Sequence, residues 1–147
     1  MPAPFAINAA TGTIRFPELS LEFRSGMPES EFISATSKLN RDNLGFNDGR
    51  QRYNIRQEIS DDRILGMFLI FQHERLWRFS LTYASKDESW DNWTEEREQA
   101  RLAEYKQELA VQLGGKDNFP WGRAWVFLDS KSGGTDIWVE FSTPVET

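Results

Sequence analysis

The chain has 147 residues, of which 39% are hydrophobic and 14% aromatic. This is enough for one hydrophobic core and too short for two comfortable domains, so we expect a single domain over residues 1–147. The net charge of −6 disfavours nonspecific binding to nucleic-acid phosphates, and the lack of cysteine excludes disulfides, thiolate metal sites and cysteine nucleophiles.

The N-terminal part is expected to form short strands. Residues 5–16 indicate two strands around a Thr11-Gly12 turn, and Pro17 ends the second strand. Residues 19–23 alternate between apolar and polar side chains, which indicates a third strand.

A short helix and a loop are expected next. Residues 29–36 follow Pro28, which suits the first turn of a helix, and we expect Phe32 and Ile33 to face the interior. Residues 37–49 are rich in Asn, Asp and Gly, so the sequence predicts a loop there.

Three strands joined by short polar turns are expected in the middle of the chain. Residues 50–59 alternate between apolar and polar side chains, whereas residues 63–71 are apolar on both faces, as in a central strand covered on both sides. Residues 77–83 alternate again, with Trp77 expected on the same face as Phe79. These strands would form an antiparallel meander.

Three arginines, Arg50, Arg52 and Arg56, share the polar face of the first of these strands. Such a row could bind carboxylates or phosphates of a ligand or a partner. The alternative is that it keeps the outer face soluble and protects it against pairing with other strands.

The longest helix is expected at residues 95–113. Thr94 is a suitable N-cap, Glu95 and Glu96 suit the positive end of the helix dipole, and Gly114 suits the C-terminal end. An apolar stripe at helical spacing should be buried: Leu102, Tyr105, Leu109 and Leu113.

A hairpin formed by residues 123–128 and 137–141 completes the expected elements. Their order never places single strands between helices, which argues against a doubly wound α/β fold. We therefore expect an α+β fold, in which an antiparallel sheet made of the meander plus hairpins carries one long and one short helix on one face.

The sequence holds no motif for catalysis. His73 is the one histidine and lies in an expected turn, so a multi-histidine metal site is excluded. No phosphate-binding loop is present either, because Gly114-Gly115-Lys116 follows a helix instead of preceding one. We expect no enzymatic activity, no cofactor and no metal.

The acidic excess and an unusual tryptophan content point to binding surfaces. Residues 61–147 carry sixteen acidic and ten basic side chains, and the loop before the long helix combines carboxylates with an aromatic residue. Trp138 falls on the polar side of the last strand. Exposed tryptophans are typical of recognition hot spots, which gives five candidate binding residues: Asp87, Glu88, Trp90, Asp91 and Trp138. The alternatives are a solvated acidic face and tryptophans that belong to the core.

Residues 89–141 combine four features: SWDNWTEE at 89–96, a Leu113-Gly114 helix end, Trp121-Gly122, and SGG at 132–134. This combination resembles a pattern in small uncharacterised bacterial proteins. The resemblance implies a bacterial origin and no particular activity.

These observations favour a non-enzymatic protein-binding domain, of the kind that masks or sequesters a basic protein partner, as immunity proteins do. A small-ligand-binding or enzymatic domain with an aromatic and arginine-lined pocket is one alternative, and a homodimeric structural subunit is another. The first residues carry neither a basic stretch nor an apolar segment, and the longest apolar run is short, so we expect a cytoplasmic protein that binds no membrane and no nucleic acid.

Overall fold

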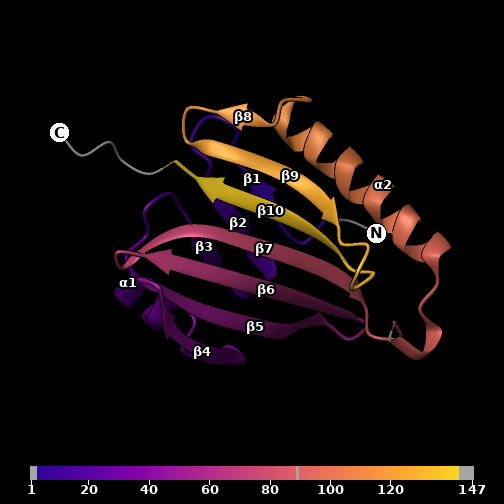
Figure 1. The fold of residues 1–147 in the computed structure, drawn as a ribbon, viewed down its shortest axis with the longest axis horizontal. Coiled ribbons are helices and arrows are strands. Elements are labelled where there is room, and N and C mark those ends of the chain that lie inside the picture. The colour runs from indigo at the N-terminus through magenta and orange to yellow at the C-terminus, as the bar shows by residue number, and fades with distance from the viewer. Residues whose placement is uncertain (1–2, 89, 143–147) are drawn as a thin grey trace.

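The computed structural model describes residues 3–88 and 90–142 (Figure 1). Over these residues the helices are α1 (Glu29–Ala35) and α2 (Glu95–Leu113), with short 3-10 turns at Pro17–Leu19 and Trp90–Asn92. The strands are β1 (Ala6–Ile7), β2 (Ile14–Phe16), β3 (Leu21–Phe23), β4 (Arg41–Asn47), β5 (Arg50–Ser60), β6 (Arg63–Gln72), β7 (Arg75–Ser85), β8 (Asn118–Phe119), β9 (Gly122–Leu128) and β10 (Thr135–Phe141). No helix in this part of the chain is both long and apolar enough to cross a membrane.

The described strands form two antiparallel sheets, which confirms the predicted α+β class. One sheet has the order β1-β2-β3, and the larger one has the order β4-β5-β6-β7-β10-β9-β8. In the larger sheet, β10 lies between β7 and β9, so the C-terminal hairpin extends the central meander (Figure 1). The predicted meander of β5, β6 and β7 is confirmed by antiparallel pairing of β5 with β6 and of β6 with β7.

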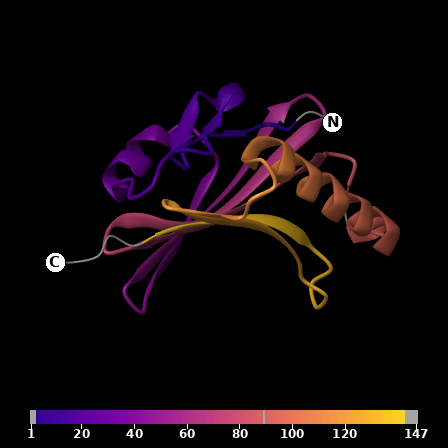
Figure 2. The same ribbon diagram turned by 90° about the horizontal axis from the view of Figure 1, so that it is seen from above.

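The seven-stranded sheet has two unlike faces. The three-stranded sheet, α1 and α2 all lie on one side of it, which we call the covered face (Figure 2). The other side, the open face, has no helix or strand of the described chain packed on it (Figure 2). The predicted arrangement of one long and one short helix on one face is therefore confirmed.

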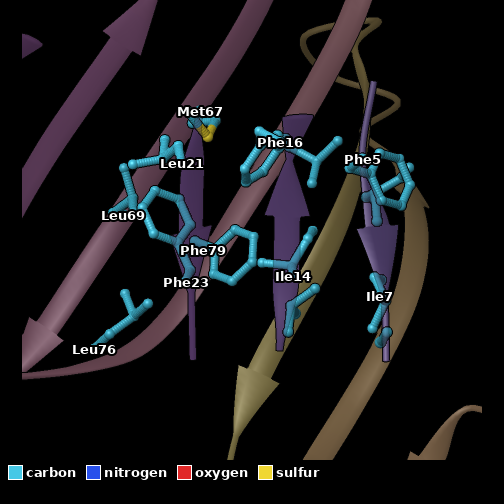
Figure 3. Packing of buried hydrophobic residues seen from close by; sticks show 14 of the residues in the cluster. Phe5, Ile7, Ile14, Phe16, Leu21, Phe23, Met67, Leu69, Leu76 and Phe79 are labelled. Carbon is cyan, nitrogen blue, oxygen red and sulfur yellow. The ribbon is translucent and has the colours of Figure 1, made fainter. Parts of the chain in front are cut away.

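The hydrophobic core lies between the covered face and the elements above it. Phe16 and Phe23 of the small sheet pack together, and Phe23 also packs edge-to-face on Phe79 of β7 (Figure 3). Phe23 and Phe79 are fully buried. Burial of such large aromatic rings is the main stabilising contribution expected for a chain without disulfides.

Helix α2 begins and ends where the sequence predicts. The Thr94 side chain accepts a hydrogen bond from the Arg97 backbone N–H, and Gly114 ends the helix in the left-handed conformation, with φ of 68°. Of the predicted stripe, Tyr105, Leu109 and Leu113 are buried, but Leu102 is only half-buried. A carboxylate, Glu98, is buried on this helix instead, 4% exposed.

Helix α1 buries one of the two residues expected to face inward. Phe32 is fully buried against Tyr53 and Phe71, whereas Ile33 is 38% exposed. The prediction for Ile33 is wrong because successive helical residues point about 100° apart, and a helix this short reaches the sheet with a narrow stripe.

The predicted loop at residues 37–49 is wrong over its second half. Residues 41–47 form β4, which pairs with β5 along its length. Its side chains are mostly exposed, so no hydrophobic alternation reveals it. Asp48 and Gly49 join the two strands with φ of 54° and 74°, and Asp-Gly is the dipeptide that such a two-residue hairpin turn favours.

Two predictions about the faces of the central strands are also corrected. Strand β6 is covered on one face only, because alternate residues such as Phe68 lie on the open face and are half-buried. Trp77 does not share the face of Phe79, because a bulge in β7 opposite Ile70 and Phe71 shifts the alternation. Leu76 is buried in its place.

Candidate functional site

The open face carries most of the unusual side chains of this protein. Alternation along β5, β7, β9 and β10 places polar and aromatic residues there, opposite the buried positions. We use the name Arg–Trp face for the cluster at its centre, which consists of Arg50, Arg52, Trp77, Arg78, Arg123, Trp125, Trp138 and Glu140.

The aromatic part of the Arg–Trp face is a pair of stacked indole rings. Trp125 of β9 pairs in register with Trp138 of β10, and their rings lie nearly parallel, with centroids 6.3 Å apart and an angle of 14°. Phe68 of β6 meets the other side of Trp138 edge-on at 6.5 Å. Both tryptophans remain partly exposed, so a rigid aromatic surface faces outward.

Arginine side chains lie against these rings. The Arg123 guanidinium is 4.5 Å from the Trp125 ring centroid, and the Arg50 and Arg78 guanidinium groups are 4.4 Å and 4.7 Å from the Trp77 ring centroid. At these distances each cation is attracted to the face of the ring. The bulge in β7 makes the arrangement possible, because it places both Trp77 and Arg78 on the open face.

Glu140 joins two of the arginines. Its carboxylate accepts hydrogen bonds from Arg78 at 2.5 Å and from Arg123 at 2.8 Å. Partial burial tends to raise the pKa of Glu140, but the two guanidinium groups outweigh burial and lower the pKa below its ordinary value. Glu140 is therefore ionised at neutral pH and holds both arginines in place.

The centre of the open face is positively charged although the chain is acidic. The described strands β5, β7 and β9 place five arginines on this face, Arg50, Arg52, Arg56, Arg78 and Arg123, and β10 adds two carboxylates. The carboxylates are Asp136 and Glu140. Charge of one sign is thus concentrated on the same surface as the exposed aromatic rings.

A cavity opens beside this cluster, where β7 and β10 separate. The two strands pair from Ile137–Leu81 to Glu140–Arg78, yet β10 begins earlier, at Thr135, and β7 continues to Ser85. The backbone groups of Tyr83 bond to α2 instead, because the Tyr105 hydroxyl donates to the Tyr83 carbonyl at 2.9 Å and accepts from its N–H at 3.0 Å. Tyr105 therefore replaces the strand pairing that β10 gives up.

The cavity has a volume of about 430 Å³ and lies between the sheet and the start of α2. Its wall on the side of α2 is a network of paired charges. The buried Glu98 carboxylate accepts from the Thr135 hydroxyl at 2.8 Å and from Arg101 at 2.5 Å, and Arg101 also pairs with Glu88. Pairing of this kind is what allows a carboxylate to be buried.

Two further charged residues line the cavity from the sheet side, Arg56 and Asp136. In the described part of the chain, neither side chain forms a hydrogen bond or an ion pair. Burial, together with the nearby negative charges of Glu98 and Asp129, raises the pKa of the Asp136 carboxyl to about 6. Asp136 is thus a partly buried carboxylate surrounded by charge of its own sign.

Among the described residues, Trp138 lies apart from the predicted binding residues of the acidic loop. Asp87 and Asp91 are exposed, while Glu88 pairs with Arg101 at the cavity. Trp138 pairs with Ser80 in the middle of the sheet, whereas the acidic loop follows the end of β7 five residues further on, roughly 17 Å along the strand. The side chain of Trp90 lies outside the described residues.

Several residues of the Arg–Trp face and of the cavity were missed by sequence reasoning. Trp77 was assigned to the core because the bulge that turns it outward has no signal in a simple alternation. Trp125 alternates with the buried Ala124, and this local signal agrees with its outward position. No local sequence pattern marks Asp136, because its lack of a hydrogen-bond partner depends on where β7 and β10 separate.

His73 lies in the exposed turn between β6 and β7, where sequence reasoning placed it. Over residues 3–88 and 90–142, no three histidine, cysteine or carboxylate side chains gather closely enough to hold a metal ion.

Comparison of the chain with protein-family models, with curated proteins and with solved structures finds no match.

Proposed function

We propose that this protein is a non-enzymatic binding domain that recognises an acidic segment of a protein partner through its Arg–Trp face. The observation that carries the proposal is the stacked pair Trp125 and Trp138, flanked by Arg78 and Arg123 on an otherwise uncovered sheet face. Tryptophan and arginine are the residues most enriched among those that dominate binding energy at protein interfaces.

The rigidity of the cluster favours tight binding. Glu140 holds Arg78 and Arg123, and the rings of Trp125 and Trp138 support each other across neighbouring strands. Side chains that are already ordered lose little conformational entropy when a partner docks on them. The partner would cover the outer face of the indole pair and offer carboxylates to the arginines at its edge.

The charge of the surface selects the partner. Five arginines against two carboxylates at the centre of the open face would attract an acidic segment and repel a basic one. This differs from the basic partner expected from the acidic loop at residues 87–91, which stays a separate prediction about a different surface. Masking or sequestering a partner needs only such a surface and no catalytic group.

Capture experiments with two matched variants would test the proposal. Wild-type protein, Trp125→Ala/Trp138→Ala and Asp87→Ala/Asp91→Ala would each be used as bait in extracts of the source organism, and partners identified by mass spectrometry. We expect partners to be retained by the loop variant and lost by the Trp variant. Affinities measured on the purified partner should fall by roughly 2 kcal/mol or more in the Trp variant.

The same variants also show which results would contradict the proposal. Retention by the Trp variant and loss by the loop variant would assign binding to the acidic loop. Tight, salt-sensitive binding of a fluorescent oligothymidylate or oligouridylate to the Arg–Trp face would instead assign it to single-stranded nucleic acid. Thermal melting of each variant shows whether a lost interaction reflects a lost fold.

A second candidate function is self-association through β4. This strand lies at the edge of the seven-stranded sheet and exposes Leu44 and Phe46, which are 53% and 69% exposed. An exposed edge strand with apolar side chains can pair with the same strand of a second copy. Sedimentation of the wild type and of Phe46→Ser would test this: a dimer that dissociates in the variant supports it, and a monomeric wild type excludes it.

A further inference from the structure

We infer that the groove running across the open face from Arg56 to Asp136 is a binding site for a small zwitterion that carries an ammonium group and a carboxylate, the chemistry of a free amino acid or a short peptide. The site lies beside the Arg–Trp face and does not depend on the function proposed for that face.

The floor of the groove follows from the strand register. Arg56 of β5 lies opposite Gly66 of β6, Gly66 lies opposite Thr82 of β7, and the register of Ile137 places Asp136 of β10 next in the row. Glycine leaves the row open at its second position, where an added Cβ would come within 3.0 Å of the Thr82 hydroxyl. A shallow cavity of about 230 Å³ lies over these residues.

The two ends of the groove carry opposite charges that are too far apart to pair. Neighbouring strands are about 4.8 Å apart, so three steps separate the Cα atoms of Arg56 and Asp136 by about 14 Å along the sheet. In keeping with this distance, the charges that act on the Asp136 carboxyl come from Glu98 and Asp129, not from Arg56. Within the described chain, both end groups are left without a hydrogen-bond partner.

The larger cavity of about 430 Å³ deepens the groove at the Asp136 end. Arg56, Thr82 and Asp136 line both cavities, so the two are continuous. The combined space is in the range of small-ligand sites. Tyr105 keeps it open, because its hydroxyl bonds the Tyr83 backbone where β10 has separated from β7.

The paired charges of the wall leave Arg56 and Asp136 as the groups available to a ligand. Arg101 is shared by Glu98 and Glu88, and Arg97 donates to the Asn92 side chain. A ligand ammonium would satisfy Asp136 in a region where the neighbouring charges are negative, and a ligand carboxylate would satisfy the Arg56 guanidinium. A simple cation would leave Arg56 unused, and a simple anion would be repelled at the Asp136 end.

Trp93 adds an aromatic surface to the cavity. It lines the same space, and its indole N–H donates to the Gly133 carbonyl at 3.1 Å, which fixes the ring over the turn between β9 and β10. The ring contributes apolar surface to this wall of the cavity. The site therefore has a place for each part of an amino acid.

The probes for a test are glycylglycine and the common L-amino acids, measured by isothermal titration calorimetry at pH 7.5 on the full chain. Each probe that binds is compared with its N-acetyl and its carboxamide derivative, which lack the positive and the negative charge respectively. We expect at least one zwitterion to bind, and each derivative to bind about tenfold more weakly or not at all.

Three variants complete the test. Asp136→Asn and Arg56→Gln should each weaken binding about tenfold or more, while Arg52→Gln, on the same strand and face but two rows away, should leave the affinity unchanged. Trp138→Ala should also leave it unchanged, which separates this site from the Arg–Trp face. Thermal melting confirms that each variant is folded.

Binding of no probe in the panel would overturn the inference. Equal binding of a zwitterion and its singly charged derivatives would overturn it too, because the charged groups at the two ends of the groove would then not contribute to recognition. So would an affinity that survives both Asp136→Asn and Arg56→Gln.

Discussion

The two faces of the seven-stranded sheet are built by the same strands yet differ in every respect that matters for function. On β7, Phe79 is fully buried under the small sheet, while its neighbour Arg78 points to the open face and binds Glu140. On β10, Val139 is fully buried while Trp138 stacks on Trp125. Alternation of side chains lets one strand serve two environments.

The comparison shows how stability and recognition are divided in this molecule. Two helices and a three-stranded sheet close the covered face with aromatic rings, and that burial stabilises the fold. Nothing in the described chain covers the open face, where charged and aromatic side chains support one another. Substitutions should therefore change stability strongly on the covered face and weakly on the open face.

The largest effect is expected for Phe79→Ala on the covered face. Phe79 packs on Phe23 and Phe141, and its loss would leave a cavity that these rings cannot fill. The free energy of unfolding should fall by about 3–5 kcal/mol, measured by chemical denaturation. A denaturation midpoint equal to that of the wild type would show that the covered face is not the stabilising one.

A smaller loss is expected for Tyr105→Phe, which keeps the ring and removes one hydroxyl. Burial raises the pKa of Tyr105 well above its ordinary value, and the hydroxyl bonds both backbone groups of Tyr83. Without it, these groups lose their partner beside the cavity, at a cost of about 1–3 kcal/mol. Hydrogen exchange of the Tyr83 amide should accelerate, whereas an unchanged rate would mean that the amide has another acceptor.

Asp136→Asn should stabilise the protein, and only above mildly acidic pH. The folded-state pKa of about 6 lies above the ordinary value of an aspartate, because of burial and the negative charges of Glu98 and Asp129. The wild type therefore loses stability as the pH rises through about 6, and keeps it below the unfolded-state pKa, near 4. The asparagine removes that loss.

Because Asp136 is partly exposed, solvent screening reduces the effect to about 1–2 kcal/mol at pH 8. Thermal melting of both proteins from pH 4 to pH 8 would measure it. The two stability curves should meet at the acidic end, and a difference that is constant with pH would contradict the assignment.

The smallest effect is expected for Phe127→Ser on the open face. Phe127 belongs to β9 and is 50% exposed, so little apolar area returns to water on its removal. The free energy of unfolding should change by about 0.5 kcal/mol or less. A loss comparable to that of Phe79→Ala would mean that the open face is covered in solution, for example by a second copy of the chain.

The sequence by itself determined the elements whose signals are local. Thr94, Gly114 and the spacing of Tyr105, Leu109 and Leu113 define α2, because caps and helical periodicity act within a few residues. Strict alternation along the last strand likewise predicted that Trp138 faces away from the side on which Val139 is buried. The fold class follows from the order of these elements.

Tertiary structure decided the features that depend on pairing between distant segments. Strand β4 exists because β5 offers it backbone hydrogen bonds, not because its own side chains are buried. Trp77 faces outward because the pairing of β6 with β7 contains a bulge. Neither pairing is encoded in the local pattern of apolar residues.

The candidate sites depend on such pairing even more strongly. Trp125 and Trp138 meet only because β9 and β10 pair in one register, and a shift by one residue would turn one ring to the other face. Asp136 has no hydrogen-bond partner in the described chain because β10 separates from β7 at this point. There the Tyr105 hydroxyl, instead of β10, bonds the Tyr83 backbone. A local sequence pattern specifies which face a side chain prefers, but the partner strand decides what lies beside it.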